Sequence, residues 1–311
     1  MVLDYATSQF LEKVSGSASK ARHLMTPQEA REAFTKLRGI LSTGSEIEEV
    51  KDLIIPVPDG EALRCRLYIP SGASALLVYF HGGGWVVGGI EEFDPMCRDL
   101  ASASGVAVAL VEYRKAPEHP YPQPIEDAWV ALNFMSQHCV DLTGCSLPLM
   151  VGGDSAGAHL AIATTLRSRD QSGPKLVGQL LIYPVTDSEF ERKSYLAPQN
   201  QLMLTIETMK YYWFHFLPEE QKRQSPSASP CRFADLHGLP SAIVITAEHD
   251  VLLDEGEEYA RRLIEAGVNV NFRRFPGQMH GFLMMRGILP GSDEGILFVG
   301  QALRGLISTE V

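Results

Sequence analysis

The fold of this chain is decided by residues 149–161, which read LMVGGDSAGAHLA. The central letters, residues 153–157, have the spacing G-x-S-x-G around Ser155. An apolar run ends just before them at Gly152, and a helical pattern of small residues begins at Ala156. A strand, a sharp turn and a helix in this order form the context in which the motif presents a serine nucleophile. Without that context, the same letters are a glycine-rich turn with an ordinary serine.

The turn at Ser155 favours glycine on both sides. A side chain pushed outward at a tight strand-to-helix bend crowds the backbone, and Gly153 and Gly157 have no side chain to clash. Ser155 then lies at the start of a helix, where free N–H groups and the positive end of the helix dipole favour developing negative charge. The N–H of Ala156 is therefore predicted to be one donor of an oxyanion hole.

The composition indicates an ordinary globular protein. The chain has 311 residues, of which 45% are hydrophobic and 21% charged. This is enough for one large α/β domain with a lid, or for two smaller domains. The formal net charge is −11 and no basic patch stands out, which argues against a nucleic acid or an anionic membrane as a partner. We interpret the acidity as a contribution to solubility.

The cysteine spacing and the first residues of the chain are used to predict the cellular location. No basic, apolar leader is found at the start, and no apolar run approaches the length of a membrane span. The five cysteines are scattered, and the spacing of the nearest pair, Cys139 and Cys145, fits neither a zinc site nor a redox motif. We therefore expect reduced thiols, a cytoplasmic location, and chemistry without a metal or cofactor.

Short apolar strands alternate with helices from residue 52 onward. The first two strands flank residues 58–60, PDG, which indicates a hairpin. All-apolar strands of this kind are typical of a mostly parallel sheet covered by helices on both faces, and the hairpin adds an antiparallel edge. The predicted class is α/β. Eight strands are expected at residues 53–56, 63–69, 76–80, 106–111, 147–152, 177–183, 242–246 and 268–275.

The pattern divides the chain into a core and two helical segments. The segments are 1–50, helical; 51–184, catalytic core; 185–235, an insertion; and 236–311, the rest of the core. The insertion is far longer than a crossover helix requires, so we predict that it forms a cap with the N-terminal helices. Docking of those helices on the side of the core is the alternative. The aromatic run at residues 211–216 either lines an acyl pocket or forms the core of the cap.

Ser155 needs a base, because a serine hydroxyl is a weak nucleophile until its proton is taken. Where such a turn presents the nucleophile, the acid and then the histidine follow along the chain. His280 lies in the loop after the last expected strand, at the carboxyl edge where ligands bind in such sheets. His159 is expected to pack in the helix after the turn, and His249 follows an earlier strand. His280 is the predicted base.

The acid is expected after the preceding strand, where residues 246–255 offer four carboxylates. Asp254 is predicted to cap the next helix, with Glu255 as its first-turn neighbour. Asp250 lies farther into the loop than Glu248 and is predicted to fix the imidazole tautomer and stabilise the imidazolium. Glu248 is the alternative.

A second glycine-rich stretch follows the strand at 76–80. Residues 81–85 read HGGGW, and three glycines let the backbone approach a bound carbonyl with its N–H groups turned inward. A phosphate-binding loop is disfavoured because no Lys-Ser/Thr follows. The N–H groups of Gly83 and Gly84 are therefore the predicted oxyanion donors beside Ala156. His81 is expected to be a scaffold for this loop rather than a catalyst.

Together these motifs resemble the hormone-sensitive-lipase-like esterases, bacterial family IV of the α/β-hydrolase fold. The likeness extends from about residue 50 to the end and includes residues 113–122, YRKAPEHPYP, and residues 280–282, HGF. The family pattern usually has Leu at the position of Lys115 and Pro-Leu where Val251-Leu252 stand. Both departures concern loop packing rather than the chemistry.

The resemblance implies a carboxylesterase acting on short- to medium-chain acyl esters of small molecules. It implies Ser155 as nucleophile, His280 as base and Asp250 as the residue that orients it, in agreement with the residue-level interpretation. The same three N–H groups, of Gly83, Gly84 and Ala156, would hold the oxyanion. The candidate substrate-pocket residues are Trp85, Tyr183, Phe214 and Phe282.

Two other functions are compatible with parts of this pattern. The same triad would serve an amide or formamide hydrolase. A small-molecule receptor is the alternative from another class, since the gibberellin receptors resemble this family. Those receptors lack the catalytic histidine, so the presence of His280 disfavours this alternative. The last strand, residues 268–275, is a candidate for pairing two copies of the chain in a homodimer.

Overall fold

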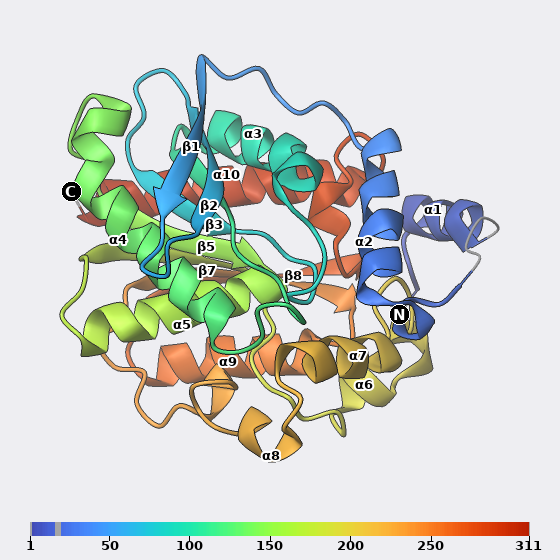
Figure 1. Cartoon of the computed structure of the whole chain (residues 1–311). Helices are drawn as coiled ribbons and strands as arrows, with labels where there is room; N and C mark the ends of the chain where they lie inside the picture. Colours follow the sequence, from blue (N-terminus) through green and yellow to red (C-terminus); the bar gives the residue numbers. More distant parts are fainter. Residues whose placement is uncertain (1, 16–19, 311) are drawn as a thin grey trace.

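Eight strands form one sheet in the computed structural model, which describes residues 2–15 and 20–310 (Figure 1). Strand β2 is antiparallel to both of its neighbours, and all other neighbours are parallel. The spatial order is β1-β2-β4-β3-β5-β6-β7-β8. The strands are β1 Glu49–Pro56, β2 Ala62–Ile69, β3 Leu76–Phe80, β4 Ala107–Glu112, β5 Leu149–Asp154, β6 Leu176–Ile182, β7 Ser241–His249 and β8 Val270–Met279. The predicted α/β-hydrolase architecture is confirmed.

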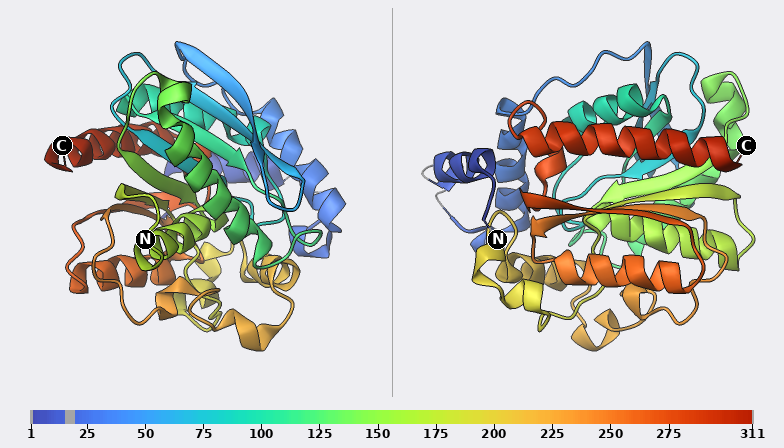
Figure 2. Two further views of the ribbon diagram at one scale, coloured as in Figure 1. Left: turned by 60° about the vertical axis from the view of Figure 1, so that its left-hand side comes forward. Right: turned by 180° about the vertical axis from the view of Figure 1, so that it is seen from behind.

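Helices cover both faces of the sheet, as Figure 2 shows. Helices α3 (Ile90–Ser104) and α10 (Pro290–Glu310) pack together on one face. Helices α4 (Gln123–Thr143), α5 (Ala156–Asp170) and α9 (Leu253–Glu265) lie on the other. Because strand side chains alternate between faces, this arrangement makes two separate apolar cores.

The N-terminal helices and the insertion lie at the edge where the parallel strands end (Figure 2). The N-terminal helices are α1 Tyr5–Ser15 and α2 Pro27–Thr35, and the insertion contains α6 Lys193–Leu196, α7 Ile206–Phe216 and α8 Glu220–Arg223. A 3₁₀ turn of the N-terminal segment, Arg22–Leu24, contacts α7, so the N-terminal segment and the insertion pack against each other. That the two segments form a cap stays a prediction. Residues 1 and 16–19 of the N-terminal segment lie outside the described residues.

Some boundaries differ from the prediction. Helix α2 begins after Thr26, which forms a capping box with Glu29, and it ends at Thr35, where the chain continues as a 3₁₀ turn, Lys36–Gly39. Strand β8 extends to Met279, so His280 follows it directly. β8 is an edge strand of the sheet, and pairing between two copies through it stays a prediction. None of the helices within residues 2–15 and 20–310 is long and apolar enough to cross a membrane.

Candidate active site

Ser155 occupies a strained turn between β5 and α5. Its backbone φ is 54° and ψ is −120°, a conformation that costs free energy for a residue with a side chain. A Cβ placed on Gly153 would lie 2.3 Å from the carbonyl carbon of Gly157, and one on Gly157 would lie 1.9 Å from the oxygen of Phe80. Both glycines are therefore required by close backbone contact, as the sequence analysis expected.

Three polar side chains from three strand ends meet at this turn. Nε2 of His280 lies 3.0 Å from Oγ of Ser155, and Nδ1 of His280 lies 2.6 Å from Oδ2 of Asp250. Asp250 is 1% exposed, and its other oxygen accepts a 2.9 Å hydrogen bond from the N–H of Leu252. In this arrangement the imidazole can accept the serine proton while the carboxylate holds its opposite nitrogen.

The other carboxylates of the acid-bearing loop have different partners. Glu248 accepts the backbone N–H of Gly277 at 2.9 Å, which leaves Asp250 as the carboxylate on His280. Asp254 was expected to cap α9, but the helix begins at Leu253, two residues earlier than that cap would place it, and the N-cap residue is Leu252, which makes no side-chain cap bond. The Asp254 carboxylate instead accepts the backbone N–H of Ser194, from the insertion, at 2.8 Å.

The glycine loop after β3 presents free backbone donors. Gly83 and Gly84 have φ of +110° and +59°, a region that disfavours other residues. In the part of the chain that the structure describes, the N–H groups of Gly83, Gly84 and Ala156 donate to no protein group. Gly84 and Ala156 are buried and Gly83 is half-buried. Backbone donors in such places are normally paired, so these three N–H groups are suited to a ligand oxygen.

A buried carboxylate joins the glycine loop to the serine turn. Oδ1 of Asp154 accepts hydrogen bonds from the hydroxyl of Tyr79 at 3.0 Å and from the N–H of Gly82 at 2.9 Å. Burial raises the pKa of Asp154 to about 7, while its hydrogen bonds and the nearby His280 act in the opposite direction. The role of Asp154 is not apparent from the sequence, in which it is only the neighbour of Ser155.

Two other histidines near the site have structural partners. Nδ1 of His81 lies 2.7 Å from the carbonyl oxygen of Gly82, and its ring stacks on Tyr113 at 4.5 Å. Nε2 of His159 lies 2.9 Å from the carbonyl oxygen of Ala228. Burial lowers the pKa of His81 to about 3 and that of His159 to about 4, so both rings are neutral at physiological pH.

The four candidate pocket residues divide into two groups. The ring of Tyr183 lies 4.6 Å from that of His280, and Phe282 lies 6.0 Å from Tyr183. Tyr183 therefore lies beside the base, and the pocket role of Tyr183 and Phe282, both fully buried, stays a prediction.

Trp85 and Phe214 make other contacts, and their pocket role also stays a prediction. Trp85 is fully buried and stacks on Phe216 at 4.1 Å. Phe214 is 58% exposed and shares the outer face of α7 with Lys210. Tyr212 is an insertion residue that reaches the site, because its ring lies against Gly84. The helical spacing of residues 211–216 indicates one helix, which is α7, but it does not indicate that Tyr212 is the aromatic residue that contacts Gly84.

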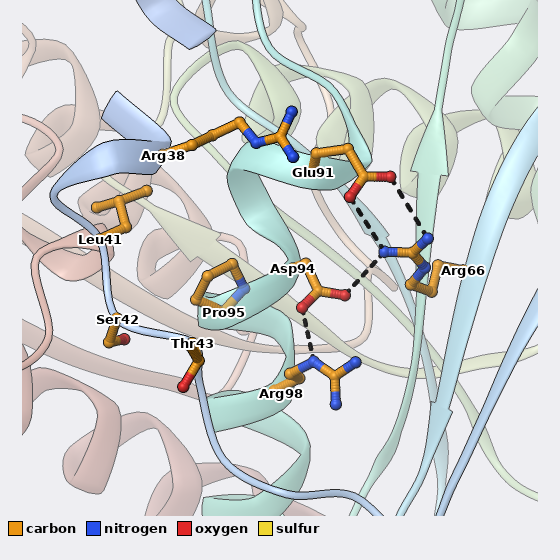
Figure 3. Close-up of a pocket in the computed structure, with 9 residues that line it drawn as sticks. All are labelled: Arg38, Leu41, Ser42, Thr43, Arg66, Glu91, Asp94, Pro95 and Arg98. Carbon is orange, nitrogen blue, oxygen red and sulfur yellow. Dashed lines mark hydrogen bonds and ion pairs between the residues drawn. The ribbon is translucent and has the colours of Figure 1, made fainter. Parts of the chain in front are cut away.

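A separate surface hollow of about 330 Å³ contains no member of this site (Figure 3). Its charges pair with one another: Asp94 accepts from Arg66 at 3.0 Å and from Arg98 at 2.6 Å. The lining residues are Arg38, Leu41, Ser42, Thr43, Arg66, Glu91, Asp94, Pro95 and Arg98. The hollow therefore lies where ion pairs connect β2 with α3. Among the described residues, histidine, cysteine and carboxylate side chains form no group of three that could hold a metal.

The chain belongs to the α/β hydrolases, since a family described as alpha/beta hydrolase fold matches residues 77–284. Its relatives confirm the hormone-sensitive-lipase-like resemblance. The chain is 36% identical to carboxylesterase NlhH of Mycobacterium tuberculosis over 74% of this chain and 72% of that protein. It is 32% identical to an ethyl acetate hydrolase of Pseudomonas putida over 98% and 99% of the two chains.

Solved structures agree over the whole chain. A hyperthermophilic esterase from the archaeon Pyrobaculum calidifontis superposes with a TM-score of 0.92 at 35% identity, covering 98% of this chain and 99% of that one. An ester hydrolase from the metagenome of Lake Arreo, complexed with a derivative of bipyridine phosphonate, gives a TM-score of 0.93 at 32% identity. It covers 99% of this chain and 100% of that one.

Proposed function

We propose that this carboxylic ester hydrolase uses Ser155, His280 and Asp250 as a catalytic triad on short- to medium-chain acyl esters. The observation that carries the proposal is the continuous chain of contacts from Ser155 Oγ to His280 Nε2 and from His280 Nδ1 to Asp250 Oδ2. Each partner lies within the distance at which a proton can be transferred or a tautomer fixed.

In the acylation step, His280 takes the proton of Ser155 while the serine oxygen attacks the ester carbonyl carbon. The carbonyl oxygen becomes negatively charged and is held by the N–H groups of Gly83, Gly84 and Ala156. The imidazolium then gives its proton to the alkoxide, the C–O bond breaks, and the alcohol leaves. An acyl group remains on Ser155.

Deacylation repeats these steps with water. His280 takes a proton from the water, the hydroxide attacks the acyl carbon, and the same three N–H groups hold the second oxyanion. When the C–O bond to Ser155 breaks, His280 returns a proton to the serine oxygen and the carboxylic acid leaves. The Asp250 carboxylate stays on Nδ1 of His280 and stabilises the imidazolium that forms in both halves.

The covered site supports short- to medium-chain acyl groups as substrates. Ser155 is only 6% exposed, and Tyr212 from the insertion lies over Gly84. A closed site beneath a cap holds a small ester more readily than a chain extending from a lipid surface. One relative is named for the hydrolysis of ethyl acetate, a small ester of this kind.

The test is a series of p-nitrophenyl esters from acetate through butyrate, octanoate and laurate to palmitate. We expect kcat/KM to be highest within acetate to octanoate and to fall for palmitate. Rates that rise steadily to palmitate would contradict the acyl-length proposal. A matched p-nitroanilide separates ester from amide hydrolysis: we expect the ester to be strongly preferred, and equal rates would favour the amidase alternative.

A further inference from the structure

The loop that contains Asp250 is held in place by the insertion. We infer that Asn200 is a positioning residue for Asp250, and that residues 186–200, which we call the support segment, fix the acid of the triad. This inference rests on the proposed function, because it concerns the placement of Asp250 against His280. We call residues 250–255 the acid loop.

Asn200 binds the acid loop at the acid itself. Its Nδ2 donates to the backbone oxygen of Asp250 at 3.0 Å and to that of Ser194, within the support segment, at 3.0 Å. A side-chain amide nitrogen has two N–H groups, so each is used once. Asn200 is 4% exposed. The Asp250 oxygen also accepts the N–H of Leu253 at 3.3 Å, so the bond from Asn200 is the one that ties this oxygen to the insertion. Solvent does not readily replace a donor lost at a buried position.

Other bonds from the support segment reach the rest of the acid loop. The hydroxyl of Ser194 donates to the oxygen of Val251 at 2.7 Å, and its N–H donates to the carboxylate of Asp254 at 2.8 Å. The N–H of Thr186 donates to the buried carboxylate of Glu255 at 2.7 Å, and the hydroxyl of Thr186 donates to the backbone oxygen of Glu255 at 2.9 Å. The acid loop is thus bonded to the insertion at both ends.

The placement of the Asp250 carboxylate follows from the placement of its backbone. Oδ1 is held by the N–H of Leu252 within the same loop, and Oδ2 contacts His280. A shift of the loop therefore changes the position of Oδ2 relative to the imidazole of His280. Because the imidazole follows the carboxylate, the position of its Nε2 relative to Ser155 changes as well. Misplacement by about 1 Å is enough to reduce a catalysed rate about 100-fold.

The two halves of the insertion act on different parts of the site. The support segment contacts the acid loop, whereas α7 contacts the glycine loop through Tyr212 and Gly84. A change at Asn200 should therefore affect the alignment of the triad without opening the substrate space. Only a donor suits position 200, because both facing atoms are carbonyl oxygens.

The experiment compares Asn200→Ala and Asn200→Asp with Gln201→Ala in the full chain. Asp has the shape of Asn but presents an acceptor in place of the donor. Gln201 is the matched control: its Nε2 donates to the oxygen of Tyr195 at 2.6 Å and its Oε1 accepts from Ile206 at 2.9 Å, so these bonds stay inside the insertion. Each variant is measured for kcat and KM on p-nitrophenyl butyrate.

A proton NMR readout tests the alignment without hydrolysis. The short Nδ1–H···O contact of His280 and Asp250 gives a far-downfield resonance, assigned by its loss in His280→Gln. We expect both Asn200 variants to lower kcat about tenfold or more with KM within about twofold, and to move or broaden this resonance. Gln201→Ala keeps the wild-type kcat and the wild-type resonance.

The inference is overturned by a folded Asn200→Ala with unchanged kcat and resonance, by Asn200→Asp behaving as wild type, or by Gln201→Ala showing the same loss. If Asn200→Ala does not fold, Asn200→Asp, which lacks the donor, decides by itself, and an unchanged kcat and resonance in that variant overturn the inference. Failure of the proposed function is a different result: Ser155→Ala would then hydrolyse esters at the wild-type rate.

Discussion

The ring of Tyr212 lies directly on the backbone of Gly84: a Cβ placed on Gly84 would lie 2.2 Å from Cγ of that ring. Tyr212 comes from the insertion and Gly84 from the loop after β3, so this contact joins the cap to the predicted oxyanion loop. Tyr212 is 5% exposed, which means that its ring is packed between the two segments. The space available to a substrate near Gly84 therefore depends on this side chain.

Tyr212→Ala should widen the substrate preference. Removing the ring opens space beside Gly84, so we expect the kcat/KM ratio of bulky to small esters to rise about tenfold. Because Tyr212 is buried, the melting temperature should also fall. Tyr212→Phe is the matched control, since it keeps the ring. An unchanged ratio in the alanine variant would show that this side chain does not bound the substrate space.

Gly83→Ala should lower kcat by about 100-fold or more, the usual effect of losing one oxyanion donor. At φ +110° an added Cβ would lie 2.2 Å from the backbone oxygen of Val87, so the loop has to move. Gly60→Ala is the control, because Gly60 has φ +90° but nothing within 4 Å of its Cβ position. We expect the control to lose stability but not kcat. Equal kcat in the two variants argues against the oxyanion role.

Asp154 should make the protein less stable as the pH rises. Burial raises its folded pKa to about 7, above the unfolded value of about 3.9, so its protonated form favours folding. That contribution is fully present below the unfolded pKa and is lost as the pH rises through about 7, at a cost of up to about 4 kcal/mol. The decline falls between about pH 4 and pH 7, and denaturant unfolding from pH 4 to 8 measures it. Asp154→Asn should show a shallower decline, and parallel curves would contradict this account.

Much of the site was predictable because its signals are local. The glycines around Ser155 follow from the crowding of one turn, and the free donors of Gly83 and Gly84 follow from a glycine run at a strand end. His280 and Asp250 were selected because parallel strands end at one edge of the sheet. The structure brings these side chains together with Ser155, while their catalytic roles remain for experiment.

The rest could not be predicted, because it consists of contacts between distant segments. A sequence pattern indicates which face of an element is buried but not which residue it meets. The contacts of Asn200 with Asp250 and of Tyr212 with Gly84 are of this kind. Asp254 illustrates the same limit: its residue type suits a helix cap, but its carboxylate binds the N–H of Ser194, 60 residues away.

The most direct test of the account is the rate of p-nitrophenyl butyrate hydrolysis by purified Ser155→Ala. The hydroxyl at this position is proposed to form the acyl-enzyme, so its removal should lower kcat at least about 1,000-fold while the fold and melting transition are retained. A folded Ser155→Ala protein that hydrolyses the ester at the wild-type rate would contradict the central claim.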